Sequence, residues 1–235
     1  MNNITVAVMS KMGGYAGPKN ISKLLKLMDI NLSPAQEVPA LCLGIMDLSL
    51  FELVGAQCIF ANKGIFNRPT SILRIEDRNG NVIYDNDANF YTKQVMNENV
   101  AFEVLQMMKK VITQGTGGSL RGGQSWGNVL HPTAGKTGTT QSNSDGWFVG
   151  LTPKLVTGVW VGAEDRGVRF RSMQWGQGAR LALPIYGYYM QKVYKDPKIG
   201  LPTTDFEQPA SYDPKLFSCD GDPQMDVPDV PQLGL

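Results

Sequence analysis

Two threonines and a lysine in one short segment combine side chains that can bind an anionic group. The segment, residues 133–140, consists of small residues and contains Lys136-Thr137-Gly138-Thr139. Its composition and flanking turns predict an extended strand. Alternate side chains of a strand point to opposite faces, so Thr137 and Thr139 share one face. Two hydroxyls on the same side of a cleft can bind a carboxylate, and Gly138, without a side chain, allows a ligand backbone to approach.

Two other motifs in the same region are incomplete. Ser125 stands in a G-x-S-x-G pattern, which needs a preceding strand, a following helix and a serine–acid–histidine order. A glycine-rich loop precedes it, and the only histidine, His131, follows with no carboxylate between. Gly135-Lys136-Thr137 resembles the end of a phosphate-binding loop, but Leu130 occupies the position that must be glycine.

The composition excludes several classes of function. With 22 basic and 21 acidic residues and no basic stripe, the chain is not expected to bind nucleic acid. No apolar run is long enough to cross a bilayer, and the N-terminus lacks the features of a signal peptide. One histidine and three cysteines without C-x-x-C spacing provide no metal-ligand set, so neither metal nor cofactor is expected.

The elements that must position the lysine and threonines form an α+β pattern, with an antiparallel sheet flanked by helices. Strands are expected at 133–140, 145–151 and 155–162, a three-strand meander. Arg78-Asn79-Gly80 predicts a hairpin. Helices are expected after Gly17-Pro18, after a Ser49/Glu52 capping box ending near Gly64, after Asn97, and over 179–194.

The helix after Asn97 has a 3.6-residue apolar period. Its expected buried face includes both methionines as core residues, and consists of Val100, Val104, Leu105, Met107, Met108, Val111 and Ile112.

The C-terminal part of the chain differs in composition from the rest. Residues 201–235 hold six of the 14 prolines, and seven acidic residues against one basic, which predicts an irregular segment. We therefore expect a folded domain over 1–195 and an acidic, proline-rich tail over 196–235.

Several segments together resemble one known family. They read GKTGTT at 135–140, DGWFVG at 145–150, VTGVWVG at 156–162, QGTG at 114–117, PALCLG at 39–44, FANKG at 60–64 and ALP at 182–184. These segments are similar to the transpeptidase domain of class A, bifunctional penicillin-binding proteins, over residues 1–195. The resemblance implies a β-lactamase/transpeptidase-like fold with its N-terminal part missing.

The resemblance also implies a reaction. In this family a serine attacks the D-Ala-D-Ala bond of a peptidoglycan stem peptide, and an amine of a neighbouring stem then captures the acyl group. β-Lactams acylate the same serine. The family pattern assigns positive potential to Lys136, carboxylate binding to Thr137 and Thr139, and an oxyanion-binding N–H to Thr139. It further implies an extracytoplasmic location, with a membrane anchor and a glycosyltransferase domain in the missing part.

The sequence departs from the family at the nucleophile. None of its serines is followed by a lysine three residues later, and no S-x-N is present. Asn2 is expected to occupy the asparagine position of S-x-N, with the serine immediately before Met1. The chain is therefore interpreted as a C-terminal transpeptidase fragment, inactive alone. The alternative is a non-catalytic module that senses peptidoglycan or β-lactams, and the codons upstream of Met1 separate the two.

Overall fold

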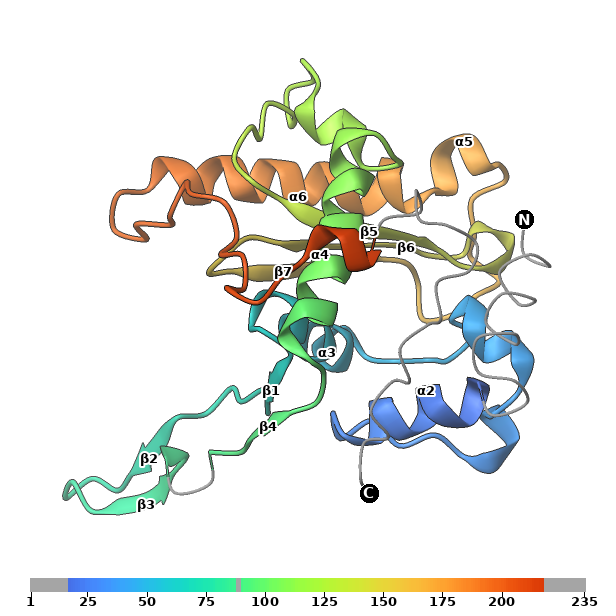
Figure 1. Cartoon of the computed structure of the whole chain (residues 1–235). Coiled ribbons are helices and arrows are strands. Elements are labelled where there is room, and N and C mark those ends of the chain that lie inside the picture. Colours follow the sequence, from blue (N-terminus) through green and yellow to red (C-terminus); the bar gives the residue numbers. More distant parts are fainter. Residues whose placement is uncertain (1–16, 88–89, 218–235) are drawn as a thin grey trace.

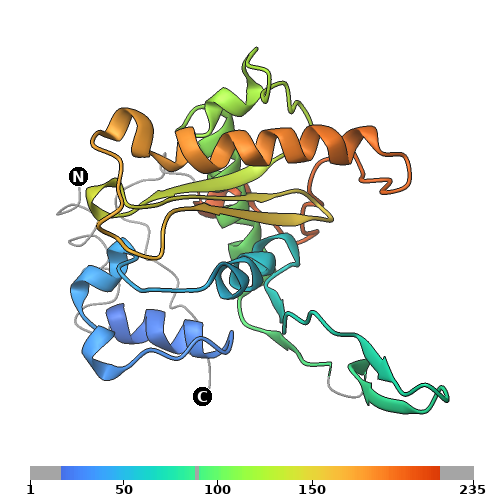
Figure 2. The same cartoon turned by 180° about the vertical axis from the view of Figure 1, so that it is seen from behind.

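A three-stranded antiparallel sheet forms the centre of the molecule. The computed structural model describes residues 17–87 and 90–217. The sheet consists of β5 (Ala134–Thr139), β6 (Gly146–Leu151) and β7 (Val156–Val161), in the order β5-β6-β7. Helix α6 (Gly178–Lys195) covers one face and α3 (Leu50–Ala61) lies against the other, as Figure 1 shows and Figure 2 repeats from behind. The predicted meander and the α+β class are confirmed.

Glycines in the sheet allow both helices to approach closely. A Cβ on Gly150 would lie 2.3 Å from the ring of Tyr186 in α6. On the other face, a Cβ on Gly158 would lie 2.4 Å from Val54 in α3. Tyr186 is fully buried and meets Phe148 edge-on, with ring centroids 4.8 Å apart. The central core therefore consists of α6 packed directly on the sheet backbone.

Helix α4 (Glu98–Thr113) packs beside β5. Its N-cap is Asn97, as predicted, because the side-chain oxygen accepts the backbone N–H of Asn99. The predicted buried face is only partly correct: Leu105 and Met108 are buried, whereas Met107 is 52% exposed. Two residues along a helix are about 200° apart, so Met107 lies opposite Leu105. Val100, 41% exposed, also lies outside the core.

The capping box of α3 forms as predicted. The N–H of Glu52 donates to the Ser49 hydroxyl at 3.2 Å, and the N–H of Ser49 donates to the Glu52 carboxylate at 2.9 Å. The Ser49 hydroxyl also donates to the Glu52 carboxylate at 2.7 Å, and this bond together with the one from the Ser49 N–H lowers the pKa of Glu52. The helix ends before Gly64, whose φ of 80° is readily adopted only by glycine.

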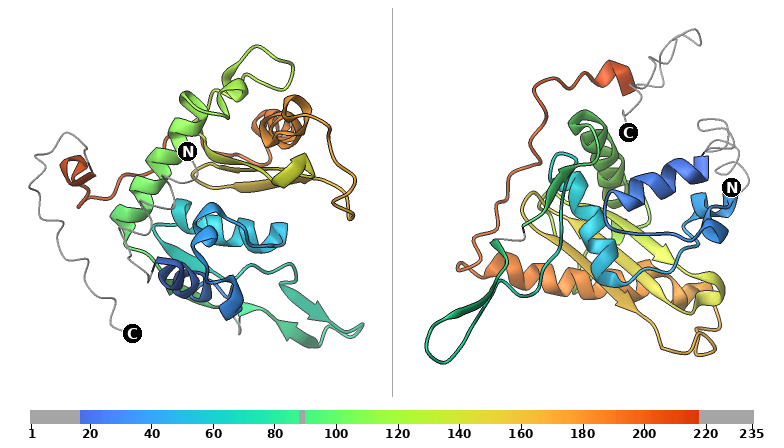
Figure 3. Two further views of the ribbon diagram at one scale, coloured as in Figure 1. Left: turned by 90° about the vertical axis from the view of Figure 1, so that its right-hand side faces the viewer. Right: turned by 90° about the horizontal axis from the view of Figure 1, so that it is seen from below.

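The N-terminal half carries shorter elements. Helix α2 (Gly17–Lys26) lies where a helix was predicted, and its first residue is also the first that the structure describes. Strands β1 (Ile65–Asn67) and β4 (Thr92–Gln94) pair with each other, and the predicted hairpin consists of β2 (Arg74–Glu76) and β3 (Val82–Asp85). This hairpin projects from the body of the molecule (Figure 3). A short helix, α5 (Met173–Gly176), precedes α6. No helix in the described part of the chain is long and apolar enough to cross a membrane.

Residues 201–217, here called the strap, follow α6 and return across α4. Apart from a 3₁₀ turn at Pro214–Phe217, the strap has no regular structure, in keeping with its composition. It is nevertheless attached at several points: Phe206 is 9% exposed, and Asp205 pairs with Lys109 at 2.6 Å. Tyr212 meets Phe102 edge-on at 4.9 Å. The rest of the tail lies outside the described residues, and the domain boundary at residue 195 stays a prediction.

Candidate active site

The candidate site is a cleft along β5, the edge strand that contains Lys136-Thr137-Gly138-Thr139. A cavity of about 770 Å³ runs beside this strand. One wall is formed by β5 and by Trp147, Val149 and Trp160 of the neighbouring strands, and the other by the segment 43–57. We call this cavity the β5 cleft. Among the described residues β5 pairs only with β6, so no described strand covers its outer edge.

Lys136 places an uncompensated positive charge in the β5 cleft. Its Nζ donates a hydrogen bond to the carbonyl oxygen of Thr137 at 2.6 Å. Within residues 17–87 and 90–217 it has no carboxylate partner in an ion pair. Partial burial of the ammonium lowers the pKa of Lys136. An anionic ligand in the cleft would therefore find a cation that is not paired with any carboxylate in the described part of the chain.

The hydroxyls of Thr137 and Thr139 lie on the face of the sheet opposite Lys136, as strand alternation requires. The Thr137 hydroxyl shares a hydrogen bond of 2.6 Å with the hydroxyl of Thr116. The Thr139 hydroxyl accepts the backbone N–H of Gly178, the first residue of α6, at 3.2 Å. Because both faces of the sheet meet at the free edge of β5, a ligand along that edge can contact groups from both.

Glycines hold α6 against β5 at this point. A Cβ on Gly178 would lie 2.2 Å from the carbonyl oxygen of Gly138, so only glycine allows this approach. A Cβ on Gly138 would itself lie 3.0 Å from the Cβ of Trp147, tighter than ordinary contact. Gly138 therefore allows the strands to pack closely on the α3 side, and it also leaves the strand accessible to a ligand.

An ion pair joins the two walls of the β5 cleft. Arg166, after β7, donates to the carboxylate of Asp47 at 2.5 Å. Both side chains are mostly exposed, 67% and 81%. Nothing in the pattern of the sequence linked these two residues, which are 119 positions apart. Asn2, the remaining predicted site residue, lies outside the described residues.

Comparison with known proteins identifies the family to which this site belongs. Residues 32–165, more than half of the chain and including all of β5, match the family described as the penicillin binding protein transpeptidase domain. The chain belongs to this family. The resemblance inferred from the flanks of Lys136-Thr137-Gly138 is therefore confirmed.

Two curated relatives of this transpeptidase domain are long proteins. The chain is 34% identical to penicillin-binding protein 1A of Aquifex aeolicus over 72% of its own length and 21% of the relative's. It is 35% identical to penicillin-binding protein 1B of Haemophilus influenzae over 77% of its own length and 22% of the relative's. The chain thus spans about a fifth of each relative.

Solved structures show the same fold. Penicillin-binding protein 1A of Haemophilus influenzae superposes with a TM-score of 0.69 at 19% identity, covering 89% of this chain and 34% of that one. PonA1 of Mycobacterium tuberculosis, solved in complex with penicillin V, superposes with a TM-score of 0.58 at 26% identity. That match covers 74% of this chain and 45% of PonA1.

The turn that follows β5 in this transpeptidase domain has a structural role. The Thr140 hydroxyl donates to the carboxylate of Asp145 and accepts the backbone N–H of Asp145 at 3.0 Å. Asp145 is 8% exposed. These bonds close the connection to β6 and fix the end of the strand that carries Thr139.

The serine and histidine of the incomplete hydrolase pattern do not line the β5 cleft. Ser125 shares a hydrogen bond of 2.5 Å with the hydroxyl of Tyr188. His131 stacks against Tyr194, with ring centroids 4.1 Å apart. Their contacts connect the glycine-rich loop to α6 and support the conclusion that the pattern is not a nucleophile site.

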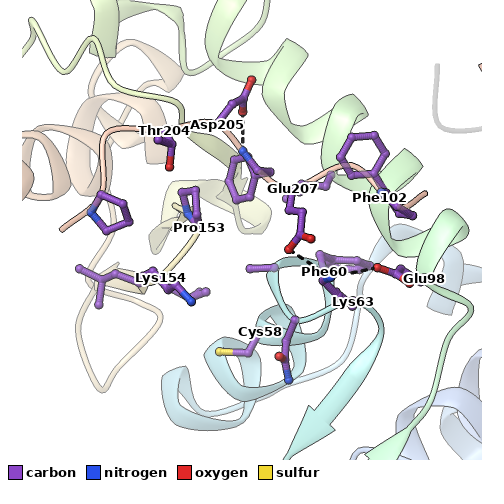
Figure 4. Close-up of a pocket in the computed structure, with 18 residues that line it drawn as sticks. Cys58, Phe60, Lys63, Glu98, Phe102, Pro153, Lys154, Thr204, Asp205 and Glu207 are labelled. Carbon is purple, nitrogen blue, oxygen red and sulfur yellow. Dashed lines mark hydrogen bonds and ion pairs between the residues drawn. The ribbon is translucent and has the colours of Figure 1, made fainter. Parts of the chain in front are cut away.

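A second cavity, of about 560 Å³, lies at the other end of the sheet, under the strap and beside the turn between β6 and β7 (Figure 4). Its charged groups are largely neutralised: Lys63 lies between Glu98 at 3.4 Å and Glu207 at 3.1 Å. Apolar side chains such as Phe60 and Phe102 form much of its lining. This cavity reflects how the strap packs and contains none of the predicted site residues.

Proposed function

We propose that the β5 cleft binds the C-terminal carboxylate of a D-Ala-D-Ala stem peptide and forms the carboxylate-binding half of a peptidoglycan cross-linking D,D-transpeptidase site. The observation that carries this proposal is that three donors lie along the outer edge of β5: the ammonium of Lys136, which has no carboxylate partner among the described residues, and the hydroxyls of Thr137 and Thr139 from the opposite face of the sheet. A carboxylate is both anionic and acceptor-only, so this set of donors matches it.

The reaction supported by this site is acyl transfer through a serine ester. The serine attacks the carbonyl between the two D-alanines, the terminal D-alanine leaves, and an amine of a second stem peptide takes the acyl group. In this proposal Thr137 and Thr139 bind the carboxylate, the N–H of Thr139 donates to the oxyanion, and Asn2 is the catalytic asparagine of S-x-N. The nucleophilic serine and its lysine belong to an S-x-x-K segment that these 235 residues do not contain.

The wider setting is part of the same proposal. As in class A proteins, the domain acts with a membrane anchor and a glycosyltransferase domain at the extracytoplasmic face of the bacterial inner membrane. Its ligands are stem peptides and the β-lactams that mimic them.

We call Lys136, Thr137 and Thr139 the carboxylate cradle. A binding experiment on the 235-residue chain tests whether this cradle binds a carboxylate. N-acetyl-D-Ala-D-Ala and its C-terminal amide are titrated while the fluorescence of Trp147 and Trp160, which line the cleft, is recorded. We expect the acid to bind more tightly than the amide. Lys136→Ala should weaken binding of the acid by about 1.5–3 kcal/mol, roughly ten- to a hundredfold. The exposed lysine Lys198 supplies the control, because Lys198→Ala should change nothing. Equal binding of acid and amide by the native chain would contradict the proposal.

A second experiment tests the missing nucleophile. The chain is incubated with a fluorescent penicillin and its intact mass is measured. We expect no covalent adduct. A stable stoichiometric adduct would show that another serine of this chain, for example Ser125, is the nucleophile.

The absence of S-x-x-K also favours one other function, a non-catalytic module that binds peptidoglycan or β-lactams as a sensor. The two functions differ in the codons upstream of Met1. An open frame that encodes S-x-x-K, with serine directly before Met1, supports the transpeptidase. A stop codon and a ribosome-binding site support the sensor.

A further inference from the structure

Thr116 lies in the turn after α4, which is folded tightly onto the end of that helix. The N–H of Gly117 donates to the carbonyl oxygen of Val111 at 2.9 Å. A Cβ on Gly115 would lie 2.9 Å from the Cα of Val111, and one on Gly117 would lie 2.7 Å from the side chain of Ile112. The close approach of backbone therefore favours glycine at 115, whereas a Cβ at 117 would displace the buried side chain of Ile112. The turn carries the exposed Thr116 to β5, 21 residues further along the chain.

The hydroxyls of Thr116 and Thr137 form a hydrogen bond whose direction the structure leaves open. Their oxygens are 2.6 Å apart, and either can be the donor. A hydroxyl has one proton and two acceptor positions. If Thr137 donates to Thr116, its proton is not available to a ligand. If Thr116 donates to Thr137, the Thr137 proton is free to point into the cleft.

At Thr139 the corresponding arrangement is already present, because the Thr139 hydroxyl accepts a hydrogen bond from the protein. The Thr139 hydroxyl accepts the N–H of Gly178 at 3.2 Å, which occupies an acceptor position and leaves the hydroxyl proton free. Gly178 is the first residue of α6, where N–H groups have no partner within the helix. Each hydroxyl of the cradle thus has a protein group beside it that can donate to its oxygen.

We propose that Thr116 is a positioning residue. When a carboxylate enters the β5 cleft, the Thr116 hydroxyl donates a hydrogen bond to the Thr137 hydroxyl, and Thr137 and Thr139 then both donate hydrogen bonds to the ligand. The inference rests on the proposed function of the cleft. A carboxylate has only acceptors, so it selects the arrangement in which both hydroxyls point toward it. Thr116 then never touches the ligand and acts through Thr137 alone.

Removal and rescue of the Thr116 hydroxyl test this role. Thr116→Val and, as a second hydroxyl-free variant, Thr116→Ala should bind N-acetyl-D-Ala-D-Ala about three- to tenfold more weakly, as expected for one lost hydrogen bond. Binding of the C-terminal amide should stay unchanged. Thr116→Ser keeps the hydroxyl and should bind the acid within about twofold of the native chain. A role in packing alone would affect acid and amide alike.

Combination with Thr137→Val separates this inference from the proposed function. In the Thr137→Val background, Thr116→Val should have no further effect, because no oxygen remains for Thr116 to donate to. If Thr116→Val and Thr116→Ala bind the acid like the native chain while Thr137→Val is impaired, the cradle stands and the role of Thr116 is overturned. If the native chain does not distinguish acid from amide, the cradle itself is wrong.

Discussion

Replacement of Gly178 by alanine should disturb both the stability and the ligand binding of this domain. The added Cβ would lie 2.2 Å from the carbonyl oxygen of Gly138 and 2.4 Å from that of Trp147. Both neighbours are backbone atoms of paired strands and cannot rotate away. Since ordinary contacts are ~3.5 Å, the start of α6 must retreat from the sheet by roughly 1 Å.

The expected magnitude follows from two opposing effects. Overpacking of this kind costs about 1–3 kcal/mol. Loss of glycine from the unfolded chain offsets about 0.4–1 kcal/mol of that cost. We expect the free energy of unfolding to fall by about 1–2 kcal/mol. In a chain of this size that lowers the melting temperature by roughly 2–8 °C.

Gly178→Ala should also weaken binding of the carboxylate ligand. The hydrogen bond from the N–H of Gly178 to the Thr139 hydroxyl is 3.2 Å long, and a retreat of α6 would break it. Thr139 would then lose the donor that keeps its own proton available. Affinity for N-acetyl-D-Ala-D-Ala should fall about three- to tenfold, with little change for the amide.

A second glycine provides the matched control. Gly123 lies in the glycine-rich loop with nothing within 4 Å of the position of its Cβ and without a positive φ. Gly123→Ala should therefore leave the melting temperature unchanged or raise it slightly. Thermal unfolding by circular dichroism and the peptide titration give both readouts. The packing argument would be refuted if the Gly178→Ala variant had the melting temperature of the native chain and the same affinity for the acid.

Three further predictions concern the strap and the charges. Phe206→Ala should lower the free energy of unfolding by about 3 kcal/mol in urea denaturation, and a loss below about 1 kcal/mol would show that the strap is not part of the cooperative unit. The carboxylate of Glu103 accepts a hydrogen bond from Tyr212 and raises the pKa of Tyr212 to about 12. That hydrogen bond stabilises the fold below pH ~10 and is lost as the pH rises through the raised value. Burial also raises the pKa of Tyr186 and of Tyr194, so ultraviolet titration should show several late tyrosines, of which Glu103→Gln brings only Tyr212 back toward its ordinary pKa. Binding of the carboxylate peptide should decline as Lys136 loses its proton, at a pH below the ordinary lysine value of 10.5, and Lys136→Arg should move the decline upward.

Local signals in the sequence predicted the elements that depend on neighbouring residues. The Ser49/Glu52 capping box and the Asn97 cap each involve residues within three positions, so their chemistry is visible in the sequence. The meander follows from alternation over short segments. Met107 was misplaced because several apolar residues on α4 exceed what one face can bury.

Contacts between distant segments were beyond such signals. The partners of the cradle, Thr116 and Gly178, come from a turn and a helix start that lie far from Lys136 in the sequence. The sequence shows the glycines beside Thr116, but it does not show that the turn places the Thr116 hydroxyl beside Thr137. The strap was expected to be irregular from its composition, yet Phe206 and Tyr212 attach it to α4. Two aromatic side chains are enough to pack the strap against α4, and they hardly change its average composition.

The groups proposed to bind the carboxylate, among the residues that the structure describes, lie between the end of α4 and the start of α6. Lys136 and the two threonines lie on one strand, and the groups proposed to orient the threonine hydroxyls lie at glycines that permit close backbone contact. In the proposed function, recognition of the carboxylate uses β5 and attack on the carbonyl uses the serine of another segment, so we expect this chain to bind the peptide reversibly without forming an ester.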